Sequence, residues 1–283
     1  MSTKNRYIRL KPLVMPMMIA RKYAGDLSRL VREMVKDYQS IITIYRDGRG
    51  QVVIDDMVND LDMRLNRLGR EWKKRFEVYA ENNTPKMVEQ VLRSSDLQIK
   101  SILKDWFAEK RFMLFGQSVP LALRQVMKAS IQENVALIKS LPLQYEERVR
   151  GAVYRAVAGG GTLKSLKKEL MKYAGMEERR AKLVAGDQTH KAFVSIAAKR
   201  MESVGVKKYM WVHTLMGKTH RPYHLRKWDG VSGKKNGHPN GLNGFIFDIH
   251  NLPIIEEKTG ERGLPGQLPF CHCKLAPVID IFD

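Results

Sequence analysis

The sequence lacks several features that would assign it to a common class of protein. Among 283 residues it has only two cysteines, Cys271 and Cys273, which are too close in sequence for an ordinary unstrained disulfide. No apolar run approaches the roughly 20 residues that a membrane-spanning helix needs. The apolar stretch 13–20 follows basic residues, as in a signal peptide, but its prolines and Arg21 argue against that interpretation. We therefore expect a soluble protein from a reducing, intracellular environment.

Recognisable catalytic motifs are also missing. The sequence shows no nucleophile with a base, no paired carboxylates and no phosphate loop. The glycines at 159–161 are not followed by the lysine and hydroxyl residue that close such a loop. The best enzymatic alternative is a metal-dependent nuclease that uses His238, Asn243 and His250. We predict that the chain is not an enzyme, with this nuclease as the alternative.

Acidic residues are scarce relative to basic ones. Lysine and arginine total 50 against 30 acidic residues, a net charge of +20. Residues 1–50 and 151–200 each hold 11 basic and 4 acidic residues, whereas residues 51–100 hold 9 of each. Such regions favour contact with nucleic acid phosphates, although lysine on helix surfaces also serves solubility. The residues predicted to bind DNA are Arg21, Lys22, Lys164, Lys167, Lys168, Arg179, Arg180 and Lys182.

Hydrophobic periodicity predicts a helical region over residues 1–205, with a basic N-terminal arm at 1–50. Between residues 60 and 83 apolar side chains recur at intervals of three and four, which places them on one helix face. More helices are expected after Pro85, over 120–140, from Pro142 to 157, over 162–175 and over 177–203. Pro85, Pro142 and Gly175 are placed to separate these helices, and glycines form a flexible joint near 158–161.

Residues 206–283 have a different character. Helical periodicity disappears, and glycine, proline and asparagine become frequent. Short runs at 209–214 and 245–248 indicate strands, while 217–244 and 250–269 show no regular structure. The predicted fold class is mainly α: a multi-helix N-terminal region followed by a small, loop-rich α+β C-terminal domain.

This last region also collects residues that bind metals. Six of the seven histidines and both cysteines lie in it. His220, His224, Cys271 and Cys273 offer four ligands for a structural zinc that would clip two long loops together. In the alternative, His224 and Arg221 bond to buried backbone and the cysteines pack as small apolar residues. The sequence leaves both interpretations open.

The order of motifs in the C-terminal third resembles the phage head morphogenesis family, the Mu F-like minor head proteins. The matching residues are Trp211 in a strand, Arg221 and His224 as Arg-x-x-His, Pro265 with Gly266, and Cys271 with Cys273 as Cys-x-Cys. The similarity extends upstream to about residue 120. The chain departs from the family's pattern at 187–189, where a Thr-Glu pair is common, and at His272, where the family has arginine.

This resemblance implies a minor head protein of a tailed bacteriophage, acting in head assembly and genome packaging or delivery. Its implied partners are the phage portal protein, genomic double-stranded DNA, and a major capsid or scaffold protein, with no membrane and no cofactor besides the zinc considered above. Its implied location is the host cytoplasm during assembly and then the virion, in the head interior near the portal. A stand-alone, non-specific nucleic-acid-binding protein is the alternative.

An apolar stretch near the N terminus is the segment expected to dock on the portal. Its prolines suit an internal core poorly, yet its side chains are apolar enough to favour burial against a partner. The residues are Leu13, Val14, Met15, Met17, Met18 and Ile19.

Overall fold

The computed structural model describes residues 7–44, 57–106, 119–158, 163–214, 221–225 and 241–280. Its helices are α1 (Met17–Ile44), α2 (Met57–Leu103), α3 (Leu121–Ala158) and α4 (Leu163–Ser203). The remaining elements are β1 (Tyr7–Arg9), β2 (Lys208–Val212), the short 3-10 helix η2 (Pro222–His224), β3 (Ile246–Asp248), β4 (Ile254–Glu256), β5 (Glu261–Arg262) and β6 (Lys274–Asp280). The predicted fold class, mainly α with a small α+β C-terminal part, is confirmed. Within the described residues, no helix is both long and apolar enough to span a membrane.

The chain divides into two compact units, each built from separate stretches of sequence. The helical unit comprises Ala20–Lys86 and Ile131–Gly186, and the mixed unit comprises Met1–Ile19, Met87–Ser130 and Asp187–Asp283. Every one of the helices α1 to α4 contributes residues to both units. The boundary at residue 206 stays a prediction, and the glycines of the expected joint, 159–161, lie outside the described residues.

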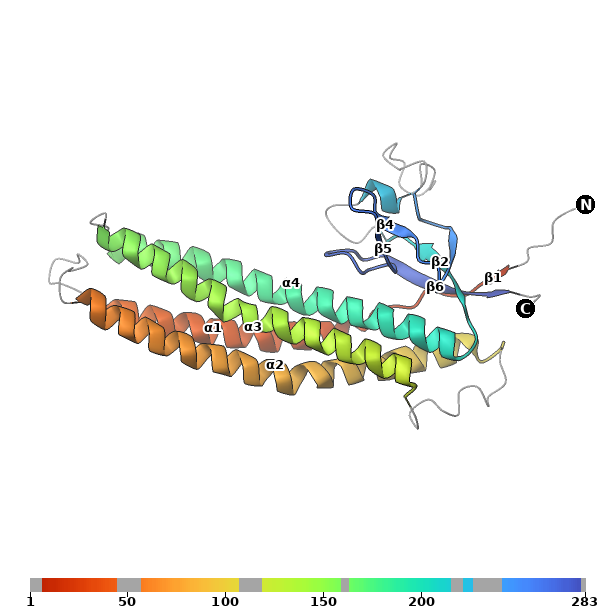
Figure 1. Ribbon diagram of the computed structural model, residues 1–283, viewed down its shortest axis with the longest axis horizontal. Coiled ribbons are helices and arrows are strands. Elements are labelled where there is room, and N and C mark those ends of the chain that lie inside the picture. The colour runs from red at the N-terminus through yellow and green to blue at the C-terminus, as the bar shows by residue number, and fades with distance from the viewer. Residues whose placement is uncertain are drawn as a thin grey trace, which may run out of the picture. The chain divides into compact units, whose positions relative to one another are not determined.

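The helical unit is a bundle in which segments of α1, α2, α3 and α4 run side by side (Figure 1). The predicted apolar face of α2 forms part of its core: Trp72 and Phe76 are fully buried, with their rings edge to face at 6.2 Å. Tyr38 of α1 and Tyr145 of α3 make a second edge-to-face pair at 5.3 Å. Because aromatic pairs prefer this geometry, the core fixes how three helices face one another.

Three of the expected helix boundaries are wrong, because α2, α3 and α4 continue through Pro85, Pro142 and Gly175. A proline inside a helix removes one hydrogen bond, and tertiary packing can offset this loss. Beside Pro85, Thr84 is fully buried, and its hydroxyl bonds to Tyr23 of α1 at 2.9 Å. Pro142 is itself buried. Both prolines therefore lie on helix faces that packing holds in place.

The mixed unit contains an antiparallel sheet with strand order β1-β6-β2-β3. Burial alternates along β2, so that Tyr209 and Trp211 point into the core. The strands expected near 209–214 and 245–248 are present as β2 and β3. A separate β4-β5 hairpin and η2 lie where no regular structure was expected, because strands of two or three residues are too short to show a period.

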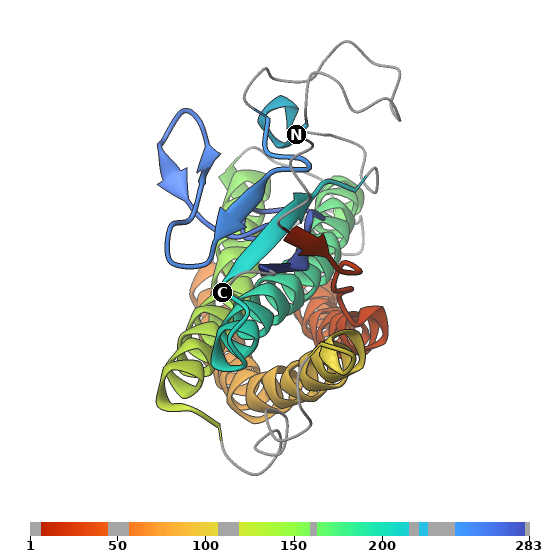
Figure 2. The ribbon, with the colours of Figure 1, turned by 90° about the vertical axis from the view of Figure 1, so that its right-hand side faces the viewer.

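Strand β1 joins the sheet from the far end of the sequence. Tyr7 pairs with Asp280 and Arg9 with Val278, which places β1 at the sheet edge beside β6 (Figure 2). The pairing continues beyond the strand, since the backbone N–H of Leu13 donates to Leu275 at 2.9 Å. The N-terminal residues are therefore part of the mixed unit's fold.

A buried ion pair joins α2 and α4 inside the mixed unit. Arg200 donates from Nε and Nη2 to the two carboxylate oxygens of Asp96, at 2.6 and 3.0 Å. The Arg200 side chain is only 2% exposed and that of Asp96 14%. Two parallel hydrogen bonds between one pair of side chains fix both the distance between α2 and α4 and the rotation of each helix about its axis at this point.

Candidate functional site

Three metal-binding side chains converge in the mixed unit. The donor atoms of His224, Cys271 and Cys273 all lie within 4.8 Å of one another, and all three residues are buried. The His224 Nδ1 atom is 3.4 Å from the Cys271 sulfur and 3.6 Å from the Cys273 sulfur. We refer to these residues as the His-Cys cluster. It brings η2 together with the residues that lead into β6.

A hydrogen bond on the far side of the ring orients His224. Its Nε2 atom lies 3.0 Å from the carbonyl oxygen of Ile255 in β4. Because a carbonyl only accepts hydrogen bonds, this nitrogen must carry the ring proton. In the neutral ring, Nδ1 is then unprotonated and directs its lone pair toward the two sulfurs. The edge of the imidazole also packs against Trp211, with ring centroids 5.0 Å apart.

The surroundings of the sulfurs favour a thiolate. A hydrogen bond from Cys273 lowers the pKa of Cys271, although burial acts the other way. The same contact with Cys271 raises the pKa of Cys273, so the pair releases its first proton readily. The backbone N–H of Thr214 donates to the Cys273 sulfur. The indole nitrogen of Trp211 is buried and, among the described residues, makes no hydrogen bond of ordinary geometry, yet it too favours negative charge on Cys273.

The loop before β6 is tied to α4. Gly266 has a φ of 90°, and a Cβ at this position would lie 2.6 Å from Nε2 of His190, so the Pro265-Gly266 turn needs glycine for two reasons. Burial lowers the pKa of His190 to about 4, which keeps that ring neutral. The backbone N–H of Phe270 donates to the Asp187 carboxylate at 3.1 Å. These contacts hold the backbone that presents Cys271.

The motif residues singled out in the sequence thus gather in one region. His224 bonds to buried backbone as expected, whereas Arg221 donates to the exposed carbonyl of Pro269 at 3.0 Å. Of the four predicted zinc ligands, His220 lies outside the described residues. Sequence reasoning missed His213, whose Nδ1 atom is 3.3 Å from the Cys273 sulfur. Its position directly after β2 and Trp211 was the available signal.

The residues of the nuclease alternative have other contacts. The Asn243 side chain accepts a hydrogen bond from the backbone N–H of His213 at 2.9 Å. His250 is 58% exposed and lies 3.5 Å from a carboxylate oxygen of Glu202. His238 lies outside the described residues.

The predicted DNA-binding residues all lie in the helical unit, most of them on α4. Lys164, Lys168, Arg179 and Lys182 are exposed, and Lys172, which sequence reasoning missed, is exposed with them. At 3.6 residues per turn, these five positions fall within an arc of about 80° and extend over roughly 27 Å. We call this set the α4 basic stripe. One member is partly neutralised, since Lys182 lies 3.0 Å from Glu178.

The other predicted contacts are placed differently. Arg21 and Lys22 are exposed on α1, whereas Lys167 and Arg180 are half-buried on α4. A side-chain nitrogen of Arg180 lies 3.3 Å from the Ser140 hydroxyl. The basic residues of α4 therefore do not all share one face.

Residues 147–276 match the Phage Mu protein F like protein family. The match confirms the family resemblance and includes both the His-Cys cluster and the α4 basic stripe. An uncharacterized protein of Haemophilus influenzae is 31% identical over 147 residues, which is 52% of this chain and 28% of that protein. The chain thus spans little more than a quarter of that relative's length. No solved structure matches the chain.

The segment expected to dock on the portal precedes the Mu F-like match. Leu13 is buried, and Gln98 of α2 bonds to both the N–H and the carbonyl of Val14 at 2.8 Å. Met18 is 76% exposed and Met17 41% exposed. Met15 and Ile19 are half-buried. Portal docking stays a prediction, and Met18, Val14 (48% exposed) and Met17 are the members most open to a partner.

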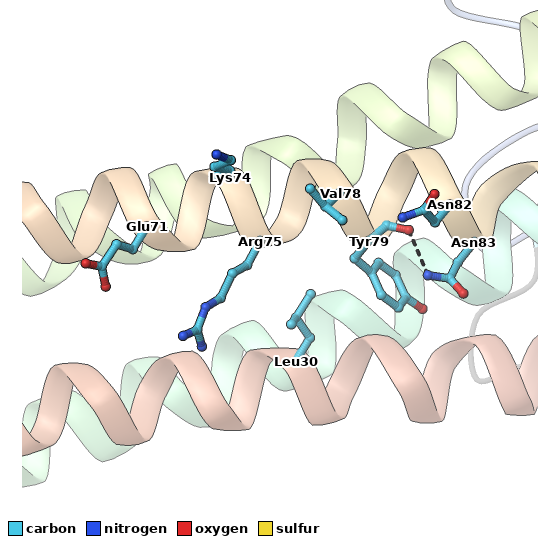
Figure 3. Close-up of a pocket in the computed structure, with 8 residues that line it drawn as sticks. All are labelled: Leu30, Glu71, Lys74, Arg75, Val78, Tyr79, Asn82 and Asn83. Carbon is cyan, nitrogen blue, oxygen red and sulfur yellow. Dashed lines mark hydrogen bonds between the residues drawn. The ribbon is translucent and has the colours of Figure 1, made fainter.

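A surface groove between α1 and α2 also lies outside the Mu F-like match. Figure 3 shows Leu30 of α1 and Tyr79 of α2 directed into it, with Asn83 bonded to the carbonyl of Tyr79 at 2.9 Å. Its charged residues, Glu71, Lys74 and Arg75, line the α2 side. The groove contains no residue of the His-Cys cluster and no pair suited to acid-base catalysis, so we assign it no function.

Proposed function

We propose that this chain is a non-enzymatic protein of phage head morphogenesis that binds duplex DNA without sequence preference. The match of residues 147–276 to the Mu F-like family carries the first part of this proposal. The α4 basic stripe supports the second part. Its site of action would be the assembled head, near the portal and the packaged genome.

The geometry of the stripe suits the DNA backbone better than the bases. A row of exposed cations about 27 Å long is comparable with one turn of duplex DNA, and it contacts phosphates by charge alone. Recognition of bases would need side chains that reach into a groove and form paired hydrogen bonds, for which Arg or Lys at guanine is the usual choice. Lysine predominates in the stripe, and its point charge sets no orientation. Affinity should therefore depend strongly on salt and weakly on sequence.

A pair of triple variants tests the stripe. Lys164, Lys168 and Lys172 are changed to Gln in one variant, and in the control the exposed α2 residues Arg70, Lys73 and Lys74 are changed to Gln, which removes the same charge. Each lysine that no longer neutralises a phosphate should reduce the slope of log K against log salt by about 0.9, so the slope should fall by about 2 to 3 in the stripe variant. The control should change little. Equal reductions in both variants would show that only net charge matters, and absence of DNA binding by the unaltered chain would refute the proposal.

The portal contact needs point substitutions rather than a deletion. Removing residues 1–20 would remove β1 and the buried Leu13, so weaker binding would have a trivial cause. Met17→Gln with Met18→Gln should weaken capture by the portal of the same phage, because both side chains are exposed. Met63→Gln with Met171→Gln is the control, since these methionines are exposed elsewhere. Equal capture of both variants would rule out docking through this segment.

The same preparations test the enzymatic alternative. The unaltered chain is incubated with plasmid DNA and Mg²⁺ or Mn²⁺. We expect no cleavage. Cleavage that disappears in His250→Ala would show that the chain is a nuclease and would overturn the non-enzymatic part of the proposal.

A further inference from the structure

We propose that the His-Cys cluster is a structural zinc site in which His224, Cys271 and Cys273 are ligands and His213 is the fourth. The inference is independent of DNA or portal binding. It rests on four features of the mixed unit: the spacing of the donor atoms, the tautomer of His224, the buried donors around the sulfurs, and the position of His213.

The spacing fits a tetrahedral ion. With zinc-sulfur bonds of about 2.3 Å and zinc-nitrogen bonds of about 2.0 to 2.1 Å, neighbouring sulfur and nitrogen ligands lie about 3.6 Å apart. The separations from His224 Nδ1 to the Cys271 and Cys273 sulfurs are 3.4 and 3.6 Å. A single residue between two cysteines would ordinarily strain their approach to one ion. Here the backbone already presents both sulfurs to the same nitrogen.

The second observation is the orientation of His224. A metal-binding histidine normally donates its other ring N–H to a carbonyl or carboxylate, which fixes the ring and leaves the ligating nitrogen unprotonated. The bond from His224 Nε2 to Ile255 does this, and Nδ1 faces the sulfurs. A bond to buried backbone was the alternative role expected for His224. That bond uses Nε2 and leaves Nδ1 available to a metal.

The third observation concerns charge and hydrogen bonds around the sulfurs. Two thiolates and a divalent ion sum to zero, so the filled site places no net charge in a buried region. The indole N–H of Trp211 is buried and lacks a conventional partner among the described residues, and its ring lies against that of His224, with centroids 5.0 Å apart. Donors of this kind stabilise metal-bound thiolates. Two sulfur and two imidazole ligands in tetrahedral geometry select zinc over harder cations.

The fourth ligand follows from the strand that carries Trp211. His213 Nδ1 lies 3.3 Å from the Cys273 sulfur, close to the separation of two ligands on one ion. It lies outside the tightest group of donors, so its ring turns toward the ion on binding. The ion would then connect the end of β2, η2 and the start of β6. The sheet already pairs the two strands there, at Val212 and Lys274, so the ion's main effect would be to attach η2 to the sheet.

The test uses the full chain, prepared under reducing conditions with added zinc and then dialysed. Elemental analysis should find about one zinc per chain. Replacement by Co²⁺ should add a sulfur-to-cobalt charge-transfer band and the intense visible bands of a four-coordinate site. Cys273→Ser and His224→Ala should lose the metal, whereas the exposed His250→Ala should keep it. X-ray absorption at the zinc edge should fit two sulfur and two nitrogen neighbours.

Each outcome decides part of the proposal. An unaltered chain that retains no zinc and gains no sulfur-to-cobalt band would overturn the site, and this result needs no variant to fold. An unchanged cobalt spectrum in His213→Ala would overturn His213 as the fourth ligand. Zinc removal by a chelator should lower the melting temperature and speed amide exchange in 241–280. Unchanged exchange there would overturn the structural role.

Discussion

The buried pair between Arg200 and Asp96 allows a quantitative test of the mixed unit. Replacing Arg200 with Met keeps the length of the side chain but removes both hydrogen bonds, at 2.6 and 3.0 Å, from a carboxylate that is only 14% exposed. Removing one partner of a buried ion pair costs about 3–5 kcal/mol, because the other charge stays buried and uncompensated. At about 2–4 °C per kcal/mol, the melting temperature should fall by roughly 10 °C.

Urea unfolding followed by circular dichroism measures this loss, and two further variants locate its cause. Arg93→Met removes the exposed pair with Glu89, whose side chains are 78% and 61% exposed, and should cost less than about 1 kcal/mol. Combining Arg200→Met with Asp96→Leu removes both buried charges and should restore most of the stability.

The loss should also depend on pH. Burial raises the pKa of Asp96, and the bonds from Arg200 partly lower it again. Without Arg200 the pKa of this carboxyl in the folded chain rises further above its ordinary 3.8, so the unfolded chain releases its proton first as pH rises. The stability of Arg200→Met relative to the unaltered chain should therefore fall as pH rises from the raised pKa of Asp96 in the unaltered chain to the still higher pKa in the variant. A loss below about 1 kcal/mol, or a double variant no more stable than Arg200→Met, would refute this reasoning.

Three other substitutions have defined outcomes, each measured by urea unfolding. Gly266→Ala should cost at least about 2 kcal/mol, from the positive φ and the approach to His190, and a loss below about 0.5 kcal/mol would contradict the turn geometry. Pro85→Ala should stabilise by about 1–3 kcal/mol, because α2 is already helical there; a loss would mean that the ring packs usefully. A hydrogen bond from Tyr154 lowers the pKa of Asp62 in the folded chain below its ordinary value of 3.8. The ionised carboxylate therefore stabilises the fold above pH 3.8, and this contribution is lost as pH falls through the folded-state pKa. Asp62→Asn should therefore differ from the unaltered chain by less than about 1 kcal/mol at neutral pH and converge with it in acid; a constant difference would exclude this linkage.

Periodicity predicted the helices well but placed their ends poorly. The stretch from 60 to 83 has an unbroken apolar face, and the residues on it form the core of the helical unit. The expected breaks at Pro85 and Pro142 were wrong. The low helix propensity of proline costs less free energy than the burial of apolar residues on both sides of it contributes. Nothing local in the sequence indicates that the hydroxyl of Tyr23 would meet Thr84 and Asn134, at 2.9 and 3.0 Å.

The sequence predicted the types of residue in the candidate site, but not every residue that belongs to it. Clustering of histidine and cysteine indicated His224, Cys271 and Cys273, and these do converge. The place of His213 depends on the register of β2 against β6, where Val212 pairs with Lys274. That register arises from long-range pairing, which spacing along the chain does not encode. In the same way, Arg179 and Lys182 join Lys164, Lys168 and Lys172 on one face only because the helix continues past Gly175.

The pairing of β1 with β6 determines when the mixed unit can be completed during synthesis. Asp280, the partner of Tyr7, leaves the ribosome 273 residues after it. At the usual 5–20 residues per second, the edge strand waits roughly 15 to 50 s for its place in the sheet. Until then Leu13 and the inner face of β2 lack their neighbours from β6, so the nascent chain exposes apolar surface that a chaperone could bind. The sheet of the mixed unit therefore closes only after β6 has been synthesised.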